Sequence, residues 1–246
     1  MENDASTYGD RWAEVYDQVH AHLDTPEAVD PAIKILAELA GDGPALELGI
    51  GTGHIALPMA RRGVKVEGLD ASAAMIEKMR QKPGGADIPV HRGDFARFDL
   101  GSSYSLVFVV FNTFFALTSQ DEQVSCLQSV ARHLGDDGTL VIEAFVPDMG
   151  RFERGQHIST GNIAPDSVTV NLDRHDPVTQ SVVSSHLRLS PAGIEIFPVA
   201  IRYAWPAELD LMARLAGLRL RSRWADWHRS PFTAASPGHI SVYERD

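Results

Sequence analysis

The sequence predicts an α/β protein built on an open, mostly parallel sheet, and two stretches lead to this expectation. In residues 44–60, a short apolar run meets three glycines at alternate positions and is followed by apolar residues at helical spacing. This pattern indicates a strand, a tight turn and a helix. Residues 106–111 form a continuous apolar run, which is typical of a strand buried on both faces of a parallel sheet.

The remaining elements of the core follow from similar patterns. Ser119 and Glu122 have the spacing of a capping box, which predicts that a helix begins there. A second helix is expected over residues 206–217. The other core strands are expected at residues 64–70, 88–91, 139–145, 218–224 and 239–244.

The glycine turn after the first strand indicates a ligand-binding turn. Glycines allow the backbone to approach a ligand closely, although in a buried turn they can also serve packing alone. Gly49 and Gly51 begin the dinucleotide-binding pattern, but its third glycine would fall at His54. This departure weighs against an NAD-linked dehydrogenase.

An acidic residue closes the second strand. Asp70 follows the glycines by roughly twenty residues, which is the distance at which a carboxylate can accept hydrogen bonds from both hydroxyls of a ribose. The alternative is a helix cap, for which Ser72 is also available. Ala71 and Met75 are expected beside the same nucleoside, but methionine is equally an ordinary core residue.

Two further turns are expected at the same edge of the sheet, because the carboxyl ends of strands in open α/β sheets bind ligands. One contains Asp94 and Phe95, and the other follows Phe111. In the second turn, either Phe114 or Phe115 lines a substrate pocket, or both pack beneath the next helix. We expect one of them, Phe115, at the pocket.

Composition restricts the partners. The 246-residue chain has a formal net charge of −11, which disfavours binding to a nucleic-acid backbone and suits cationic or neutral small molecules. A single cysteine, Cys126, cannot form an intramolecular disulfide or a cysteine-based zinc site, and no metal-ligand spacing stands out. No run is long and apolar enough to span a membrane, and we expect a cytoplasmic protein.

The chain is expected to fold as a single domain, residues 1–246. Its predicted parts are an N-terminal helical cap (1–40), a cofactor-binding core (41–146), a β insertion (147–205) and a segment that completes the core (206–246). In the insertion, three alternating strands are expected at 167–172, 180–189 and 193–203. The acid-poor stretch 178–190 is a candidate surface for a homo-oligomer.

Two tyrosines of the N-terminal cap are candidate site residues. Tyr8 and Tyr16 lie eight residues apart and share a helix face if one helix spans both. Each carries a hydroxyl group that core packing does not need. We expect them to orient a substrate or to bind a carboxylate of the cofactor.

Taken together, the motifs resemble those of the class I methyltransferases that use S-adenosylmethionine (SAM). The similarity covers residues 40–146 and implies a Rossmann-like fold with a seven-stranded, mostly parallel sheet, N-terminal helices and an antiparallel insertion after the fifth strand. It also implies that Asp94 accepts from the adenine amino group and that the Phe95 N–H reaches the ring. The cofactor positions implied are Glu47, Gly49, Gly51, Asp70, Ala71, Met75, Asp94, Phe95 and Phe111.

The N-terminal tyrosines and the insertion are similar to actinobacterial natural-product methyltransferases, a group that includes amino-sugar and lincosamide N-methyltransferases. Many such enzymes have arginine where this chain has His54, so no cofactor contact is assigned to it. The expected function is methylation of a small-molecule amine in antibiotic biosynthesis, with Tyr8, Tyr16 and Phe115 at the acceptor. Because no histidine lies in a motif that marks a base, nitrogen is favoured over oxygen as acceptor. An O-methyltransferase and a non-catalytic SAM-binding module are the alternatives.

Overall fold

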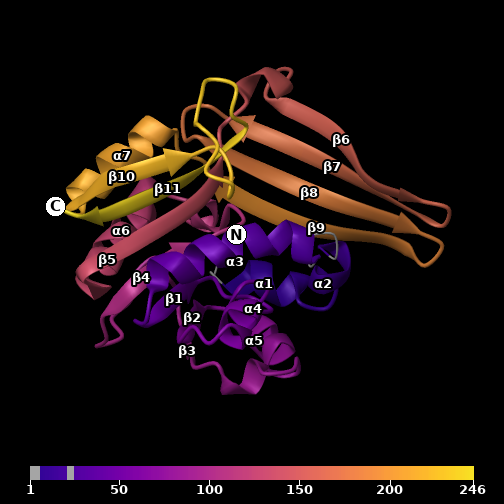
Figure 1. The fold of residues 1–246 in the computed structure, drawn as a ribbon. Helices are drawn as coiled ribbons and strands as arrows, with labels where there is room; N and C mark the ends of the chain where they lie inside the picture. Colours follow the sequence, from indigo (N-terminus) through magenta and orange to yellow (C-terminus); the bar gives the residue numbers. More distant parts are fainter. Residues whose placement is uncertain (1–5, 21–24) are drawn as a thin grey trace.

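The computed structural model describes residues 6–20 and 25–246, except for the side chains of residues 6–8, 26 and 28. Its centre is a seven-stranded sheet in the order β10-β11-β5-β4-β1-β2-β3, in which β11 alone runs antiparallel to its neighbours (Figure 1). The mostly parallel sheet expected from the sequence is therefore confirmed. The strands are β1 (Ala45–Leu48), β2 (Val66–Asp70), β3 (Val90–Arg92), β4 (Tyr104–Val109), β5 (Leu134–Phe145), β10 (Leu218–Trp224) and β11 (Gly238–Arg245).

Helices cover both faces of this sheet, as the buried strands require. One apolar cluster joins the sheet to α3 (Pro26–Ala40), α4 (Ala56–Arg61) and α5 (Ala73–Arg80). The other joins it to α6 (Gln120–His133) and α7 (Pro206–Leu215). Short 3₁₀ helices occupy three of the connections: η2 (Gly85–Asp87), η3 (Thr113–Ala116) and η4 (Met149–Arg151).

The predicted capping box begins α6. The Glu122 N–H donates to the Ser119 hydroxyl at 3.1 Å, and the Ser119 N–H donates to the Glu122 carboxylate at 2.9 Å. Two of the N–H groups that a helix start leaves without partners are thereby satisfied.

Several strand boundaries differ from the prediction, and two of the differences, in β4 and β5, reflect local features of the backbone. β4 ends at Val109, because Phe111 and Asn112 adopt left-handed conformations with φ of 54° and 63°. Each costs about 1–2 kcal/mol for a residue other than glycine, so the surrounding contacts must hold the turn in place. β5 begins earlier than expected, at Leu134, and the glycine-aspartate turn bulges within the strand, between the pairs Tyr104–Leu134 and Leu106–Thr139.

The insertion forms a second, four-stranded antiparallel sheet in the order β6-β7-β8-β9, and Figure 1 shows it projecting from the core. Three of its strands were predicted. β7 is longer than expected, whereas β8 and β9 lie within one residue of the predicted bounds. β6 was not predicted, because Gly161 and Asn162 interrupt its alternation of apolar and polar residues. The strands are β6 (Gln156–Ala164), β7 (Ser167–Asp176), β8 (Ser181–Ser190) and β9 (Gly193–Arg202).

The two faces of this second sheet differ. One face packs on the N-terminal helices, where Phe197 and Val199 lie against Trp12. The opposite face is apolar and exposed, and the strand register places seven large aliphatic side chains on it. These are Ile158, Ile163, Leu172, Val183, Leu189, Ile194 and Ile196.

Residues 6–20 of the N-terminal cap form two short helices rather than one. α1 (Ser6–Trp12) and α2 (Tyr16–Val19) are separated by a turn in which the Val15 N–H donates to the Trp12 carbonyl. Tyr8 and Tyr16 therefore lie on different helices, and the expectation of one shared helix face is wrong. No helix of residues 6–20 and 25–246 is long and apolar enough to cross a membrane.

Candidate active site

The glycine turn leaves open space at one position. Gly49, Gly51 and Gly53 all have positive φ, between 54° and 84°. A Cβ at Gly49 would lie 2.5 Å from the Thr113 methyl group, and one at Gly53 would lie 2.7 Å from Cγ of Met79. A Cβ at Gly51 would meet nothing closer than the Gly49 carbonyl at 3.9 Å. Gly49 and Gly53 thus serve close packing, whereas Gly51 exposes its backbone to a space that a ligand can enter.

Asp70 lies directly against this turn. Its Oδ2 accepts a hydrogen bond from the Gly51 N–H at 2.7 Å, and its Oδ1 accepts from the Ser72 N–H at 2.8 Å. Burial raises the pKa of Asp70, while these N–H groups act in the opposite direction. Each oxygen keeps a further lone pair for a hydroxyl. The helix cap of α5 is Ser72, whose hydroxyl accepts from the Met75 N–H, so capping does not fall to Asp70.

Glu47 is a second acid beneath the turn. Its side chain is buried, and among the described residues its Oε2 has no hydrogen-bond partner. Burial raises its pKa well above the usual range, and the nearby Asp70 charge acts in the same direction. A buried acceptor without a partner at this place suits a ligand that brings a donor group.

The other predicted cofactor residues lie at the same edge of the sheet. Phe95 follows β3, and its ring edge is 3.8 Å from the position of a Cβ at Gly49. Phe111 follows β4, and its ring centroid lies 6.3 Å from that of His54. Asp94 is exposed, and its Oδ1 accepts from the Ala96 N–H. The turns after the first four strands in the chain therefore converge, as the parallel strands require.

Some predicted site residues lie elsewhere or serve packing. Phe114 and Phe115 are buried in the core, and the Phe115 ring packs edge-on at 5.0 Å from Phe145. This placement favours the packing alternative for both phenylalanines. Met75 is buried among Trp12 and its neighbours, which favours its role as a core residue. Ala71 is half-buried directly after Asp70, and the Tyr8 side chain lies outside the described residues.

The N-terminal cap is tied to the glycine turn through Asp17. Its carboxylate accepts from the Thr52 hydroxyl at 2.6 Å and pairs with the Lys82 ammonium group at 2.9 Å. Burial acts to raise the pKa of Asp17, but these two hydrogen bonds outweigh it and lower the pKa. Two further acids of the cap bind α5. Asp10 accepts from the hydroxyl of Ser72, the N-cap residue, and Glu14 accepts from the ammonium group of Lys78. The cap is thus fixed over the turn by charge and hydrogen bonding.

An aromatic cluster lies where the cap, the glycine turn and the insertion meet. The Tyr16 ring is 4.3 Å from His20 and 5.7 Å from His54, measured between centroids. The Trp12 ring contacts His20 of the cap and both His186 and Phe197 of the insertion. Sequence reasoning missed this grouping, because its members come from three distant segments and no single segment carries a motif for it.

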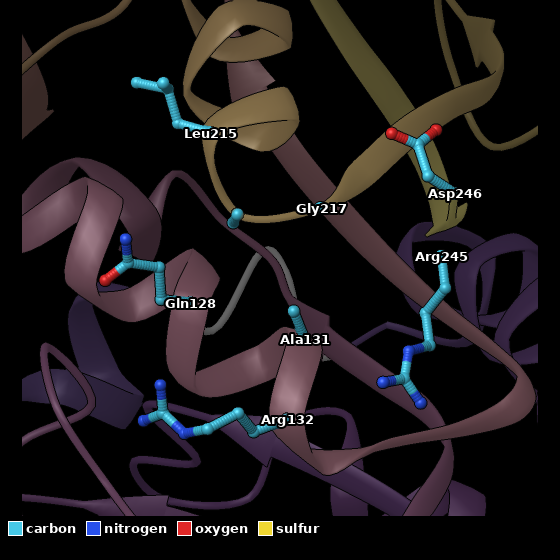
Figure 2. Close-up of a pocket in the computed structure, with 8 residues that line it drawn as sticks. Gln128, Ala131, Arg132, Leu215, Gly217, Arg245 and Asp246 are labelled. Atoms are coloured by element: carbon cyan, nitrogen blue, oxygen red, sulfur yellow. The ribbon is translucent and has the colours of Figure 1, made fainter.

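The pocket in Figure 2 is a separate feature. It is lined by Gln128 and Arg132 of α6, by the end of α7 and by Arg245 and Asp246 at the chain end. Arg245 donates to the Leu134 carbonyl at the start of β5. The pocket therefore lies at the amino-terminal ends of the parallel strands, whereas the glycine turn lies at their carboxyl ends. It therefore has no part in the site.

A glycine turn, an acid at the end of the second strand and a helical cap over both define the site of a class I SAM-dependent methyltransferase. The chain belongs to this family. Residues 45–138 match the family described as "Methyltransferase domain". The chain is accordingly an enzyme rather than a non-catalytic module or an NAD-linked dehydrogenase.

Comparisons with individual proteins agree. The structure of the CcbJ methyltransferase from Streptomyces caelestis is similar over 98% of this chain and 99% of that chain, with 41% identity and a TM-score of 0.92. The cypemycin N-terminal methyltransferase of a Streptomyces species is 28% identical over 99% of both chains. A dTDP-3-amino-3,6-dideoxy-alpha-D-glucopyranose N,N-dimethyltransferase from Streptomyces fradiae is 30% identical, over 68% of this chain and 66% of that protein.

The residues present fit SAM. The open backbone at Gly51, the free lone pairs of Asp70 and the unsatisfied oxygen of Glu47 match a ligand that has ribose hydroxyls and an ammonium group. When bound, SAM supplies a methyl group that its positively charged sulfonium already activates. The protein's part is to hold the acceptor in line and to keep water out, and the tied-down cap contributes to the second task.

Replacing Asp70 by asparagine is expected to weaken cofactor binding by about 10–100-fold, because the amide group loses an acceptor and a charged hydrogen bond contributes about 1.5–3 kcal/mol. Isothermal titration with S-adenosylhomocysteine (SAH) measures this directly. Asp87→Asn, at an exposed carboxylate in η2, is the control and should bind SAH as the wild type does. Unchanged SAH affinity in a folded Asp70→Asn protein would contradict the ribose role.

Proposed function

We propose that this enzyme methylates an amine nitrogen of a small natural product in antibiotic biosynthesis. The observation that carries the proposal is the nature of the relatives. The cypemycin enzyme, which matches the whole chain, is named for an N-terminal methyl transfer, and two further relatives are named as N,N-dimethyltransferases of amino sugars. The match to the cypemycin enzyme includes the cap and the insertion, which are the parts that we propose surround the acceptor.

The aromatic cluster supports an amine acceptor. A neutral amine brings its own lone pair, so it needs alignment rather than a base. The half-buried Tyr16 has a ring face that can attract an ammonium group, and its hydroxyl can orient an N–H, while the buried Trp12 supports the cluster from behind. We retain Tyr8 and Tyr16 as proposed acceptor residues, whereas the burial of Phe115 gives it a supporting role behind the site.

O-methylation is the second candidate, and one observation favours it. His20, His54 and His186 come together in the aromatic cluster although they are far apart in sequence. Burial lowers the pKa of His186, which keeps its imidazole neutral at pH 7 and able to accept a proton. A hydroxyl acceptor generally needs such a base.

Matched acceptor pairs distinguish the two candidates. A short peptide with a free N-terminal amine and a dTDP-amino sugar are each compared with the analogue that carries a hydroxyl in place of the amine. Mass spectrometry after incubation with SAM should show a methyl group on an amine and none on its hydroxyl partner. Higher kcat/KM for a hydroxyl partner would reverse the assignment.

We further propose that the insertion joins two copies of the chain. Its exposed aliphatic face spans four strands of nine or ten residues. At spacings of about 3.3 Å per residue and 4.8 Å per strand, this face covers on the order of 500 Å². Two copies together would bury on the order of 1,000 Å², which is about the least that a specific interface requires.

A single buried cysteine also agrees with a proposed cytoplasmic location.

The dimer proposal is tested by sedimentation velocity. The wild-type protein should sediment as a dimer, and Ile196→Asp, which puts a charge on the aliphatic face, should give a monomer. Leu211→Asp, at an exposed leucine of α7, is the matched control and should remain dimeric. A monomeric wild-type protein, or a dimer that persists in Ile196→Asp, would refute this interface.

A further inference from the structure

The turn after β4 touches the cofactor turn directly. The Thr113 methyl group lies where a side chain at Gly49 would be, 2.5 Å from the position of its Cβ. The ring of Phe111 lies edge-on to the ring of His54 at the other end of the glycine turn. A displacement of residues 111–113 would therefore alter the packing around Gly49 and the space beside Gly51.

This turn needs an external restraint. Phe111 and Asn112 both have positive φ, a conformation that residues other than glycine rarely adopt. Consecutive residues of this kind persist only where the surroundings fix them. The end of β5 supplies that restraint, since the Phe145 N–H donates to the Asn112 side-chain oxygen at 2.7 Å.

Glu143 supplies the second restraint, from the same end of β5. Its Oε2 accepts from the Phe111 N–H at 2.9 Å, and its Oε1 accepts from the indole N–H of Trp227 at 3.0 Å. Both carboxylate oxygens are thus occupied by N–H donors from segments far apart in the sequence. Burial raises the pKa of Glu143, and the two donors offset part of that effect by favouring the charged form.

We propose that Glu143 is a positioning residue for cofactor binding, which holds the turn at residues 111–113 against the glycine turn and ties it to the C-terminal segment through Trp227. Glu143 acts through the Phe111 backbone and does not itself contact the acceptor. The proposal rests on the assignment of SAM as cofactor and is independent of the acceptor atom. Failure of the amine proposal would leave it unaffected.

Glu143→Gln tests this role, because an amide has only one acceptor oxygen and must turn its NH₂ group toward one of the two N–H donors. SAH affinity by isothermal titration should fall at least fivefold, and KM for SAM should rise while kcat at saturating SAM stays within twofold. Glu208→Gln is the matched control. Glu208 accepts from Arg202 and Gln180 beside α7, so its replacement should lower the Tm without changing SAH affinity.

A double variant separates positioning from general destabilisation. The Trp227→Phe change removes the indole N–H. In the double variant Glu143→Gln with Trp227→Phe, the amide oxygen can therefore accept from the Phe111 N–H, and the amide NH₂ group no longer points at another donor. SAH affinity should return to within twofold of the wild type. If Glu143→Gln alone does not fold, Glu143→Asp, whose shorter side chain cannot span both donors, should show the fivefold loss. Wild-type affinity in Glu143→Gln or Glu143→Asp, or a double variant as weak as Glu143→Gln, would overturn the proposal.

Discussion

The hydrogen bond from the Gly51 N–H to the Asp70 carboxylate couples the first two strands of the sheet at their carboxyl ends, and the rest of the site depends on it. A parallel sheet places these turns side by side, but it does not orient a carboxylate toward a backbone N–H. The positive φ of Gly51 does so, since it turns the peptide toward the end of β2. The same geometry leaves lone pairs on Asp70 for the hydroxyls of a ribose.

Around this fixed centre, the protein adds two variable parts. The cap is attached by acids of α1, α2 and the turn between them, which reach the glycine turn and α5, and the insertion meets the cap through Trp12 and Phe197. The aromatic cluster at their junction takes one member, His54, from the glycine turn and the others from the cap and the insertion. This division allows one cofactor site to be combined with different acceptor sites.

The sequence was sufficient to predict the elements whose signals are local. The glycine spacing, the acid at Asp70 and the capping box at Ser119 each identify a feature within a few residues, and the structure has all three. The left-handed turn at Phe111 was not predictable, because the contacts that hold it come from β5 and the C-terminal segment. The aromatic cluster and the role of Glu143 depend in the same way on the tertiary fold.

A crystal structure of the wild-type protein with SAH tests the central claim most directly. The account predicts that the ribose hydroxyls lie within hydrogen-bonding distance of the Asp70 carboxylate and that the amino-acid part of SAH lies along the backbone of residues 49–51. Ribose hydroxyls bound by other groups, with Asp70 still paired only to the Gly51 and Ser72 N–H groups, would contradict it.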